Sequence, residues 1–222
     1  SIRKAAGLAG APQKAPDQGH FEARYAHCDV LIAGAGPAGL MAALTAGRAG
    51  LRVMIADEGS EAGGSLLSRK LVIDGQPAMD WVAGTVAELS DMPNVTHLQN
   101  ATVWAYREHN YLMVNERAPD NPSLLERNWR VRAGHVITAT GAIERPLSFA
   151  GNDVPGVMLA SAVRDYVTLY GASPGDRTLV VTNNDDAYRT AIALKEAGLD
   201  VPMIADARSN VAGPLVDEAR GL

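Results

Sequence analysis

A glycine-rich hexapeptide, GAGPAG, spans residues 34–39 and directly follows the apolar run at residues 30–33. In such a strand-to-helix turn the first glycine permits the tight bend, the second lets backbone approach a pyrophosphate, and the last lets the helix pack on the strand. The phosphates of a dinucleotide would bind the unpaired amides at the helix N-terminus. The residues predicted to form this contact are Gly34, Gly36, Pro37, Ala38 and Gly39.

An acidic pair, Asp57 and Glu58, follows the next apolar run. Asp57 lies 23 residues after Gly34 (57 − 34), close to the ~20 residues expected before the acid that binds an adenosine ribose. A carboxylate there accepts hydrogen bonds from the 2′-hydroxyl and repels a 2′-phosphate, so we expect NAD or FAD rather than NADP. The motif does not distinguish NAD from FAD, and a glycine turn used only for packing is the alternative interpretation.

Two further glycine-containing segments fall where a doubly wound sheet binds ligands, at the carboxyl ends of its strands. The loop at residues 58–67 contains Gly64 and Ser65, and Ser65 could contact a phosphate or a ribose. A plain turn is the alternative for this loop. Gly141 ends a later apolar run, and a glycine there again lets backbone approach the cofactor.

The elements that would position these residues alternate between strand and helix. Short apolar runs predict parallel strands at residues 30–33, 52–56 and 95–98. Apolar residues at steps of three and four predict helices at residues 40–47 and 77–90. This order is that of a dinucleotide-binding fold.

From residue 101 the apolar period changes to two. This pattern predicts antiparallel strands at residues 102–106, 111–115 and 129–133, and a last parallel strand at 135–138. A β-meander inserted before the last parallel strand is typical of flavoproteins. We therefore predict an α/β fold of the FAD/NAD(P)-binding flavoprotein-like type with two dinucleotide-binding domains, a parallel sheet and an inserted antiparallel β-meander.

Changes in composition divide the chain into three parts. Residues 1–28 are rich in Ala, Gly, Pro, Gln and Lys without sustained periodicity, and we interpret them as an N-terminal arm or linker. Residues 29–150 form the predicted dinucleotide-binding domain. Residues 151–222 form a second Rossmann-like unit, degenerate and incomplete.

The second unit repeats the strand, helix and strand order, but its turn reads TNNDDA. Thr182 and Asn184 occupy the glycine positions nearest the phosphates. Asp185 and Asp186 place negative charge at the helix end that would receive an anion. We predict that this unit binds no nucleotide.

Length, composition and charge limit the possible functions. The 222 residues are 47% hydrophobic and carry a net charge of −5, which leaves no basic field for nucleic acid. No apolar run approaches the ~20 residues that span a bilayer, and no signal-peptide pattern is present. We expect a cytoplasmic protein with no membrane partner. The absence of an initiator Met and the ending at Leu222 suggest a piece of a longer chain.

Residues with reactive or metal-binding side chains are few. Cys28 is the single cysteine, which excludes an internal disulfide and a cysteine-ligated cluster, and the five histidines show no ligand spacing. We predict no metal site. No catalytic acid–base pair or nucleophile is recognisable, so the residue chemistry indicates a cofactor-holding module.

Five stretches together resemble the α subunits of heterotetrameric sarcosine oxidases. The resemblance spans nearly the whole chain, and its last stretches are more specific than any glycine motif. The stretches are GAGPAGL (34–40), ADE followed by GGSLL (56–67), ATGAIERPL (139–147), GNDVPGVMLASAVRDY (151–166) and TNNDDAYRTAIALKEAG (182–198).

The resemblance implies an internal segment of a longer polypeptide that assembles with β, γ and δ subunits. Such complexes oxidise sarcosine to glycine, reduce O2 to H2O2 and pass the one-carbon unit to tetrahydrofolate, which binds a C-terminal part absent here. FAD and FMN are carried mainly through the β subunit, and the α subunit binds NAD. On the family pattern the NAD contacts are Ala38, Asp57, Glu58, Ser65 and Val103.

Two other interpretations stay open. The related opine or amine dehydrogenase α subunits share the general pattern and would make this an FAD-binding chain. A non-catalytic nucleotide-fold scaffold is the third possibility.

Overall fold

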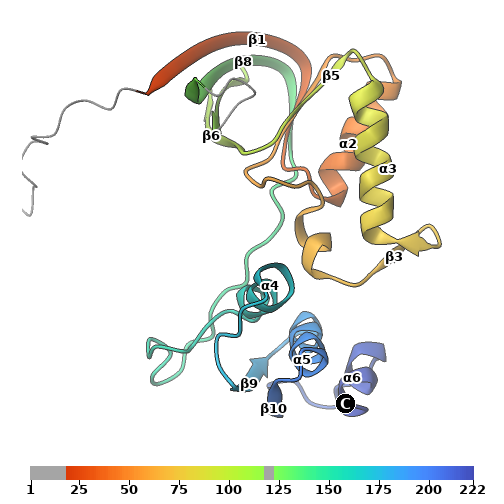
Figure 1. Ribbon diagram of the computed structural model, residues 1–222, viewed down its shortest axis with the longest axis vertical. Helices are drawn as coiled ribbons and strands as arrows, with labels where there is room; N and C mark the ends of the chain where they lie inside the picture. Colours follow the sequence, from red (N-terminus) through yellow and green to blue (C-terminus); the bar gives the residue numbers. More distant parts are fainter. Residues whose placement is uncertain (1–18, 118–122) are drawn as a thin grey trace, which may run out of the picture.

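The computed structural model describes residues 19–117 and 123–222, which form two lobes joined by an extended segment (Figure 1). The first lobe is built on a six-stranded sheet of order β5-β2-β1-β8-β7-β6. Strands β5, β2, β1 and β8 pair in parallel, and β8 also pairs antiparallel with β7, which pairs antiparallel with β6. The strands are β1 (His20–Ala33), β2 (Val53–Ala56), β5 (Val95–Leu98), β6 (Ala101–Arg107), β7 (Tyr111–Arg117) and β8 (Leu124–Thr138).

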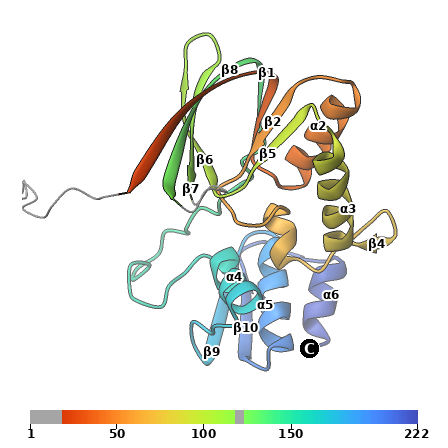
Figure 2. The same ribbon diagram turned by 45° about the horizontal axis from the view of Figure 1, so that its top comes forward.

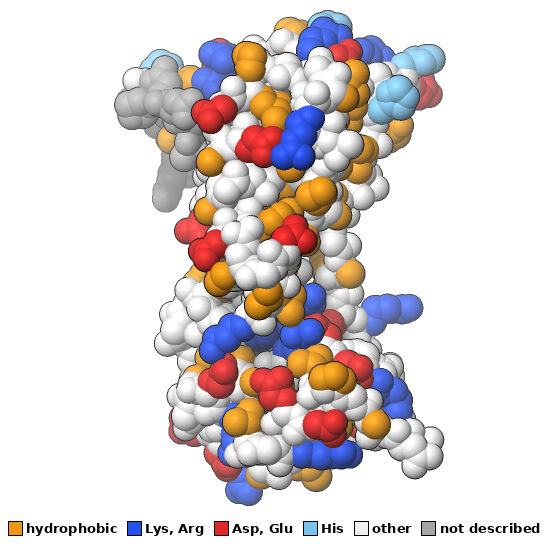
Figure 3. Space-filling model, turned by 90° about the vertical axis from the view of Figure 1, so that its right-hand side faces the viewer, with side chains coloured by type: hydrophobic (Ala, Val, Ile, Leu, Met, Phe, Trp, Pro, Cys, Tyr) orange, Lys and Arg blue, Asp and Glu red, His pale blue; other side chains and the backbone are white. Residues whose placement is uncertain are grey.

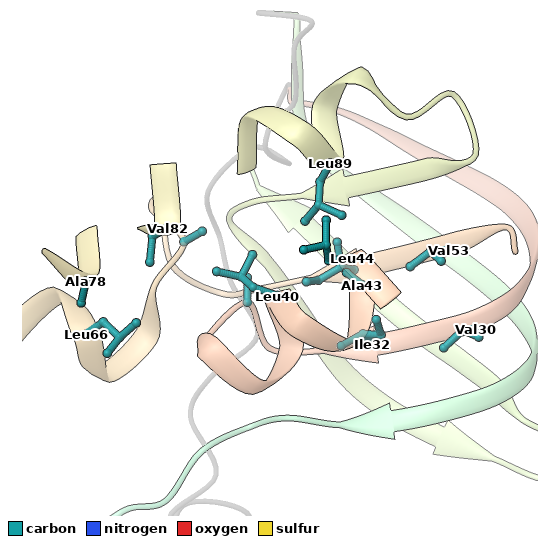
Figure 4. Packing of buried hydrophobic residues seen from close by; sticks show 13 residues of the cluster. Val30, Ile32, Leu40, Ala43, Leu44, Val53, Leu66, Ala78, Val82 and Leu89 are labelled. Atoms are coloured by element: carbon teal, nitrogen blue, oxygen red, sulfur yellow. The ribbon is translucent and has the colours of Figure 1, made fainter. Parts of the chain in front are cut away.

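Helices α2 (Pro37–Arg48) and α3 (Ala78–Asp91) cover one face of the parallel strands (Figure 2). Leu40 and Leu44 of α2 belong to one buried cluster with the sheet residues Ile32 and Val53 (Figure 4). Burying a side chain such as Leu40, which has 0% exposure, contributes about 1.5–3 kcal/mol. This packing fixes the start of α2 against the end of β1.

The β-meander curls over the opposite face of the same sheet. Its core joins Leu31 and Met54 of the parallel strands to Leu112, Val114 and Val131 of the meander. A short segment between β2 and α3 contains the 3-10 helix η1 (Gly64–Ser68) and the hairpin β3 (Val72–Ile73) and β4 (Gln76–Pro77). The predicted parallel sheet with an inserted meander is therefore confirmed.

Strand β1 begins at His20, so the residues from 20 to 28 that we interpreted as linker are strand. They pair in parallel with β8, from Phe21 opposite Glu126 to Cys28 opposite Ala133. Charged and imidazole side chains interrupt the apolar residues of this stretch, and it is paired with a strand that lies far away in the sequence. Residues 1–18 of the expected arm lie outside the described residues.

The two strands predicted at residues 129–133 and 135–138 are one continuous strand, β8. Gly134 was the apparent break between them. A Cβ atom at Gly134 would lie 2.9 Å from the carbonyl oxygen of Asp29 on the adjacent strand. The glycine therefore serves close strand approach and does not end the strand.

The second lobe carries the parallel strand pair of the second Rossmann-like unit (Figure 2). Gly171, with a left-handed φ of 59°, ends α4. The elements are α4 (Ala160–Tyr170), β9 (Arg177–Thr182), α5 (Asp186–Glu196), β10 (Asp200–Asp206) and α6 (Pro214–Arg220). Among the described residues, no helix is both long and apolar enough to cross a membrane.

Two ion pairs join the segment after η1 to helix α5 of the second lobe. Arg69 Nη2 lies 3.0 Å from Asp186 Oδ1, and Lys70 Nζ lies 2.8 Å from Glu196 Oε2. Figure 3 shows Lys and Arg side chains gathered where the two lobes meet. The segment between β2 and α3 is therefore held from both lobes.

Candidate dinucleotide site

Two glycines of the turn between β1 and α2 are required by the fold itself. Gly34 has a φ of +106°, and a Cβ atom there would lie 2.3 Å from the carbonyl oxygen of Ala139. A Cβ atom at Gly39 would lie 1.8 Å from the carbonyl oxygen of Gly34. Both contacts are with backbone atoms that cannot move aside, so any side chain would disrupt the turn.

Gly36 differs from Gly34 and Gly39 because no contact within the described residues requires a glycine there. Its φ of −71° suits any residue, and the nearest atom to an added Cβ is the Cα of Gly64 at 3.9 Å. A Cβ atom would therefore clash with nothing at Gly36, and the glycine leaves backbone exposed for the close approach that a pyrophosphate requires. Gly36 caps α2 and Pro37 follows at its first position.

The start of α2 favours an anion electrostatically. Its first turn contains no acidic residue, and the cap makes no side-chain hydrogen bond. The amides of Ala38 and Gly39 lie in that first turn, where the helix offers no carbonyl partners. The positive end of the helix dipole points into the same space.

Asp57 holds the glycine turn through the backbone amide of Ala35, which the spacing of the motif did not reveal. Its Oδ2 accepts a hydrogen bond from the amide of Ala35 at 2.6 Å, and its Oδ1 accepts one from the amide of Gly59 at 2.8 Å. Each carboxylate oxygen can accept a further bond, so a ribose hydroxyl can still bind. Asp57 is therefore a positioning residue as well as a candidate ribose contact, and Glu58 beside it is exposed.

The loop that contains Gly64 and Ser65 lies directly against the turn. The amide of Gly63 donates to the carbonyl of Ala35 at 2.9 Å, and the Cα of Gly64 faces that of Gly36. Ser65 is exposed at the start of η1, while Leu66 is buried and anchors it. The structure thus brings this predicted pair beside the space in front of Gly36.

The segments that carry Val103 and Gly141 start beside this region. The amide of Ala101, at the start of β6, donates to the carbonyl oxygen of Asp57 at 2.7 Å, and Val103 follows it, partly buried. Ala139, at the end of β8, donates to the carbonyl of Ala33 at 2.8 Å. Gly141 then has a φ of +73° with open space around it. Contact of either residue with adenine or flavin stays a prediction.

His97 on β5 is a neighbour of this site that the sequence analysis treated as an ordinary histidine. It pairs with Ile55 in the strand before Asp57. Burial lowers the pKa of its imidazole, and the negative charge of Asp57 opposes that shift only in part. Its Nε2 atom is buried without a hydrogen-bond partner among the described residues. No signal in the sequence separates it from the other histidines.

The corresponding turn of the second unit is closed by its own side chains. Thr182 Oγ1 accepts from the amide of Asn184 at 3.0 Å and donates to the carbonyl of Asn184 at 2.9 Å. Arg208 bridges Asp185 at 2.7 Å and Asp206 at 2.8 Å. Side chains therefore occupy the positions that are open in the first unit.

The carboxylates of this second turn are compensated, contrary to the sequence-based expectation of free negative charge. Asp185 pairs with Arg208, and Asp186 pairs with Arg164 at 3.1 Å and with Arg69 at 3.0 Å. The arginines come from distant parts of the chain, which no local pattern indicates. Repulsion is thus a weaker reason against a bound phosphate than steric closure of the turn.

Metal and thiol chemistry have no visible centre in the part of the chain that the structure describes. No group of three or more His, Cys, Asp and Glu side chains there could hold a metal ion. Burial raises the pKa of the Cys28 thiol to about 11. The thiol is therefore neutral and unreactive near neutral pH.

Comparison with known proteins gives several matches. The sequence pattern of the family described as pyridine nucleotide-disulphide oxidoreductase matches residues 28–220. The α subunit of sarcosine oxidase from Rhizobium meliloti (strain 1021) is 48% identical over 93% of this chain, which covers 22% of that protein. One subunit of the opine oxidase from Agrobacterium tumefaciens (strain Ach5) is 29% identical over 85% of this chain and 39% of its own length.

A solved structure, the L-proline dehydrogenase from P. horikoshii, superimposes with a TM-score of 0.65 at 24% identity. It covers 89% of this chain and 38% of its own chain. The chain is therefore homologous to sarcosine oxidase α subunits over most of its length, as the sequence motifs predicted. It spans about a fifth of the sarcosine oxidase subunits that it matches.

Proposed function

Because the chain belongs to the pyridine nucleotide-disulphide oxidoreductase family, we propose that it is the NAD-binding portion of a sarcosine oxidase α subunit. The observation that carries the proposal is Gly36, whose missing side chain the protein's own packing does not explain. A dinucleotide pyrophosphate in front of Gly36 accounts for it. The identity of 48% to a sarcosine oxidase α subunit supports the choice of enzyme.

The residues around the turn have distinct tasks towards NAD. The amides of Ala38 and Gly39 hold the pyrophosphate at the N-terminus of α2. Asp57, already bonded to the amides of Ala35 and Gly59, accepts a ribose hydroxyl. Ser65 contacts the phosphates or ribose, and Val103 lies beside the adenine. Bound NAD supplies a nicotinamide ring that can exchange a hydride.

The activity belongs to the longer protein in this proposal. Sarcosine is oxidised to glycine, O2 is reduced to H2O2, and the one-carbon unit passes to tetrahydrofolate on a part of the longer polypeptide outside this chain. FAD and FMN are carried mainly through the β subunit, and γ and δ subunits complete a cytoplasmic heterotetramer. The 222-residue chain contains no recognisable acid–base pair for this chemistry, so by itself it produces no peroxide from sarcosine.

Identification of the bound nucleotide tests the proposal. The chain is purified without added nucleotide, denatured, and the released small molecules are identified by mass. Release of NAD is the expected result. Release of FAD would favour the opine or amine dehydrogenase alternative, and a chain that neither retains nor rebinds either nucleotide would favour a scaffold. Peroxide formation from sarcosine by the isolated chain would contradict the assignment of a cofactor module.

A further inference from the structure

One face of the meander sheet gathers positive charge in a chain that is acidic overall. Cross-strand register places four arginines on the face opposite the buried core of the meander, together with one carboxylate, Glu126. With His27 neutral, the charge of this face is +3 (four minus one), against −5 for the whole chain. The arginines are Arg107, Arg117, Arg130 and Arg132. We call this surface the arginine face.

These arginines also lack the partners that other arginines have. Within residues 19–117 and 123–222 there are fifteen arginines, and ten of them form ion pairs with carboxylates. Four of the remaining five lie on the arginine face. Outside this face, ten of the eleven arginines in the described residues are neutralised by carboxylates, so a concentration of unneutralised groups on one face indicates charge kept for another molecule.

Two of the four arginines are held in place by aromatic rings of neighbouring strands. The Arg130 guanidinium lies 5.2 Å from the ring centre of Tyr25 and donates to its hydroxyl, and Arg132 lies 5.0 Å from the ring centre of Tyr111. Arg132 also donates to the carbonyl of His109 at 3.0 Å. An arginine carries five N–H donors, so most donors of each group stay free while the group itself is already ordered.

We propose that the arginine face binds an acidic surface of a partner protein. Preordered arginines beside exposed aromatic rings, such as Tyr25 at 70% exposure, are typical of the centres of protein interfaces. A carboxylate can accept two parallel hydrogen bonds from the free edge of a guanidinium group. Nucleic acid fits less well, because one guanidinium group already lies against each of the rings of Tyr25 and Tyr111, at 5.2 and 5.0 Å from the ring centres, which leaves less of each ring for a base to stack on.

Binding of an acidic probe tests this inference, which does not depend on the nucleotide assignment. Fluorescence anisotropy measures association of a short labelled poly-L-glutamate with the 222-residue chain at low and high salt. We expect salt-sensitive binding that weakens about tenfold or more in the Arg130→Gln, Arg132→Gln double variant. Arg177→Gln is the matched control, because Arg177 is exposed in the second lobe and paired with Asp200, and it should bind the probe normally.

A second variant shows whether weaker binding results from lost charge or from misfolding of the double variant. Arg107 is exposed at the edge of the same face, so Arg107→Glu should leave the circular dichroism spectrum unchanged and still weaken binding. Equal binding by the wild type and both variants would overturn the proposal. Stronger binding of a short oligothymidylate than of poly-L-glutamate would overturn it in favour of nucleic acid. Self-association that disappears in the double variant would overturn it in favour of a second copy of the chain.

Discussion

The two strand–turn–helix–strand units share one plan and differ at the turn. In the first unit, Asp57 binds the backbone amides of Ala35 and Gly59, and Gly36 leaves the space before the helix open. In the second unit, Asp206 at the equivalent place pairs with Arg208, which also pairs with Asp185. The acid at the end of the second strand thus fixes the turn in both units, and the side chains of the turn decide whether a ligand has room.

The largest expected effect is a loss of stability on replacing Asp186, which tests whether the second turn serves the structure and not a ligand. Arg164 has 3% side-chain exposure and pairs with Asp186. Asp186→Ala leaves this buried charge without its carboxylate and should lower the free energy of unfolding by about 3 kcal/mol. Urea denaturation measures the loss. The double variant Asp186→Ala, Arg164→Met should recover part of the stability, and a single variant as stable as the wild type would contradict the structural role.

The next effect compares two glycines of the first turn. Gly36→Val should keep stability within about 1 kcal/mol, because the protein leaves room there, yet weaken NAD binding by about 2–3 kcal/mol through loss of phosphate contacts with amides. Gly39→Val is the matched variant and should cost about 3 kcal/mol of stability, since its side chain meets a backbone carbonyl. Calorimetry and denaturation measure the two quantities. Normal NAD affinity in Gly36→Val would remove the site.

Asp57→Ala tests whether the acid at the end of the second strand binds a ligand in the first unit, in contrast to Asp206 in the second unit. The variant loses one hydrogen bond to the glycine turn, one to the following loop and the proposed ribose contact, so NAD affinity should fall by about 1–3 kcal/mol. Discrimination against NADP should also decrease, because the carboxylate no longer repels a 2′-phosphate. Titration calorimetry with both nucleotides measures these changes. Unchanged affinity for both would remove the role given to Asp57.

The smallest effect is expected at Asp185 in the second turn. Its pair with Arg208 is exposed, so Asp185→Ala should change stability by only about 0–1 kcal/mol. Thr182 and Asn184 still close the turn in this variant, and binding should stay at one nucleotide per chain. A second equivalent of nucleotide bound by the wild type and lost in the variant would show that the second unit is a binding site.

Local sequence determined the parts of this protein that depend on neighbouring residues. The spacing of Gly34, Gly36 and Gly39 after an apolar run indicated the strand, turn and helix, because backbone sterics and helical periodicity act over a few residues. The change to a period of two predicted the meander, and Asp57 was identified by its distance from the turn. These features were sufficient for the fold class and for the first candidate site.

Only the tertiary structure decided the parts that depend on distant partners. Strand β1 extends back to His20 because β8 pairs with it, and the charged side chains in this stretch made it look like a linker in the sequence. Asp185 and Asp186 looked like free charges until the fold placed Arg208 and Arg164 against them. The arginine face exists because four strands come into register. Such contacts close long loops, and their partners are chosen by packing that no local pattern records.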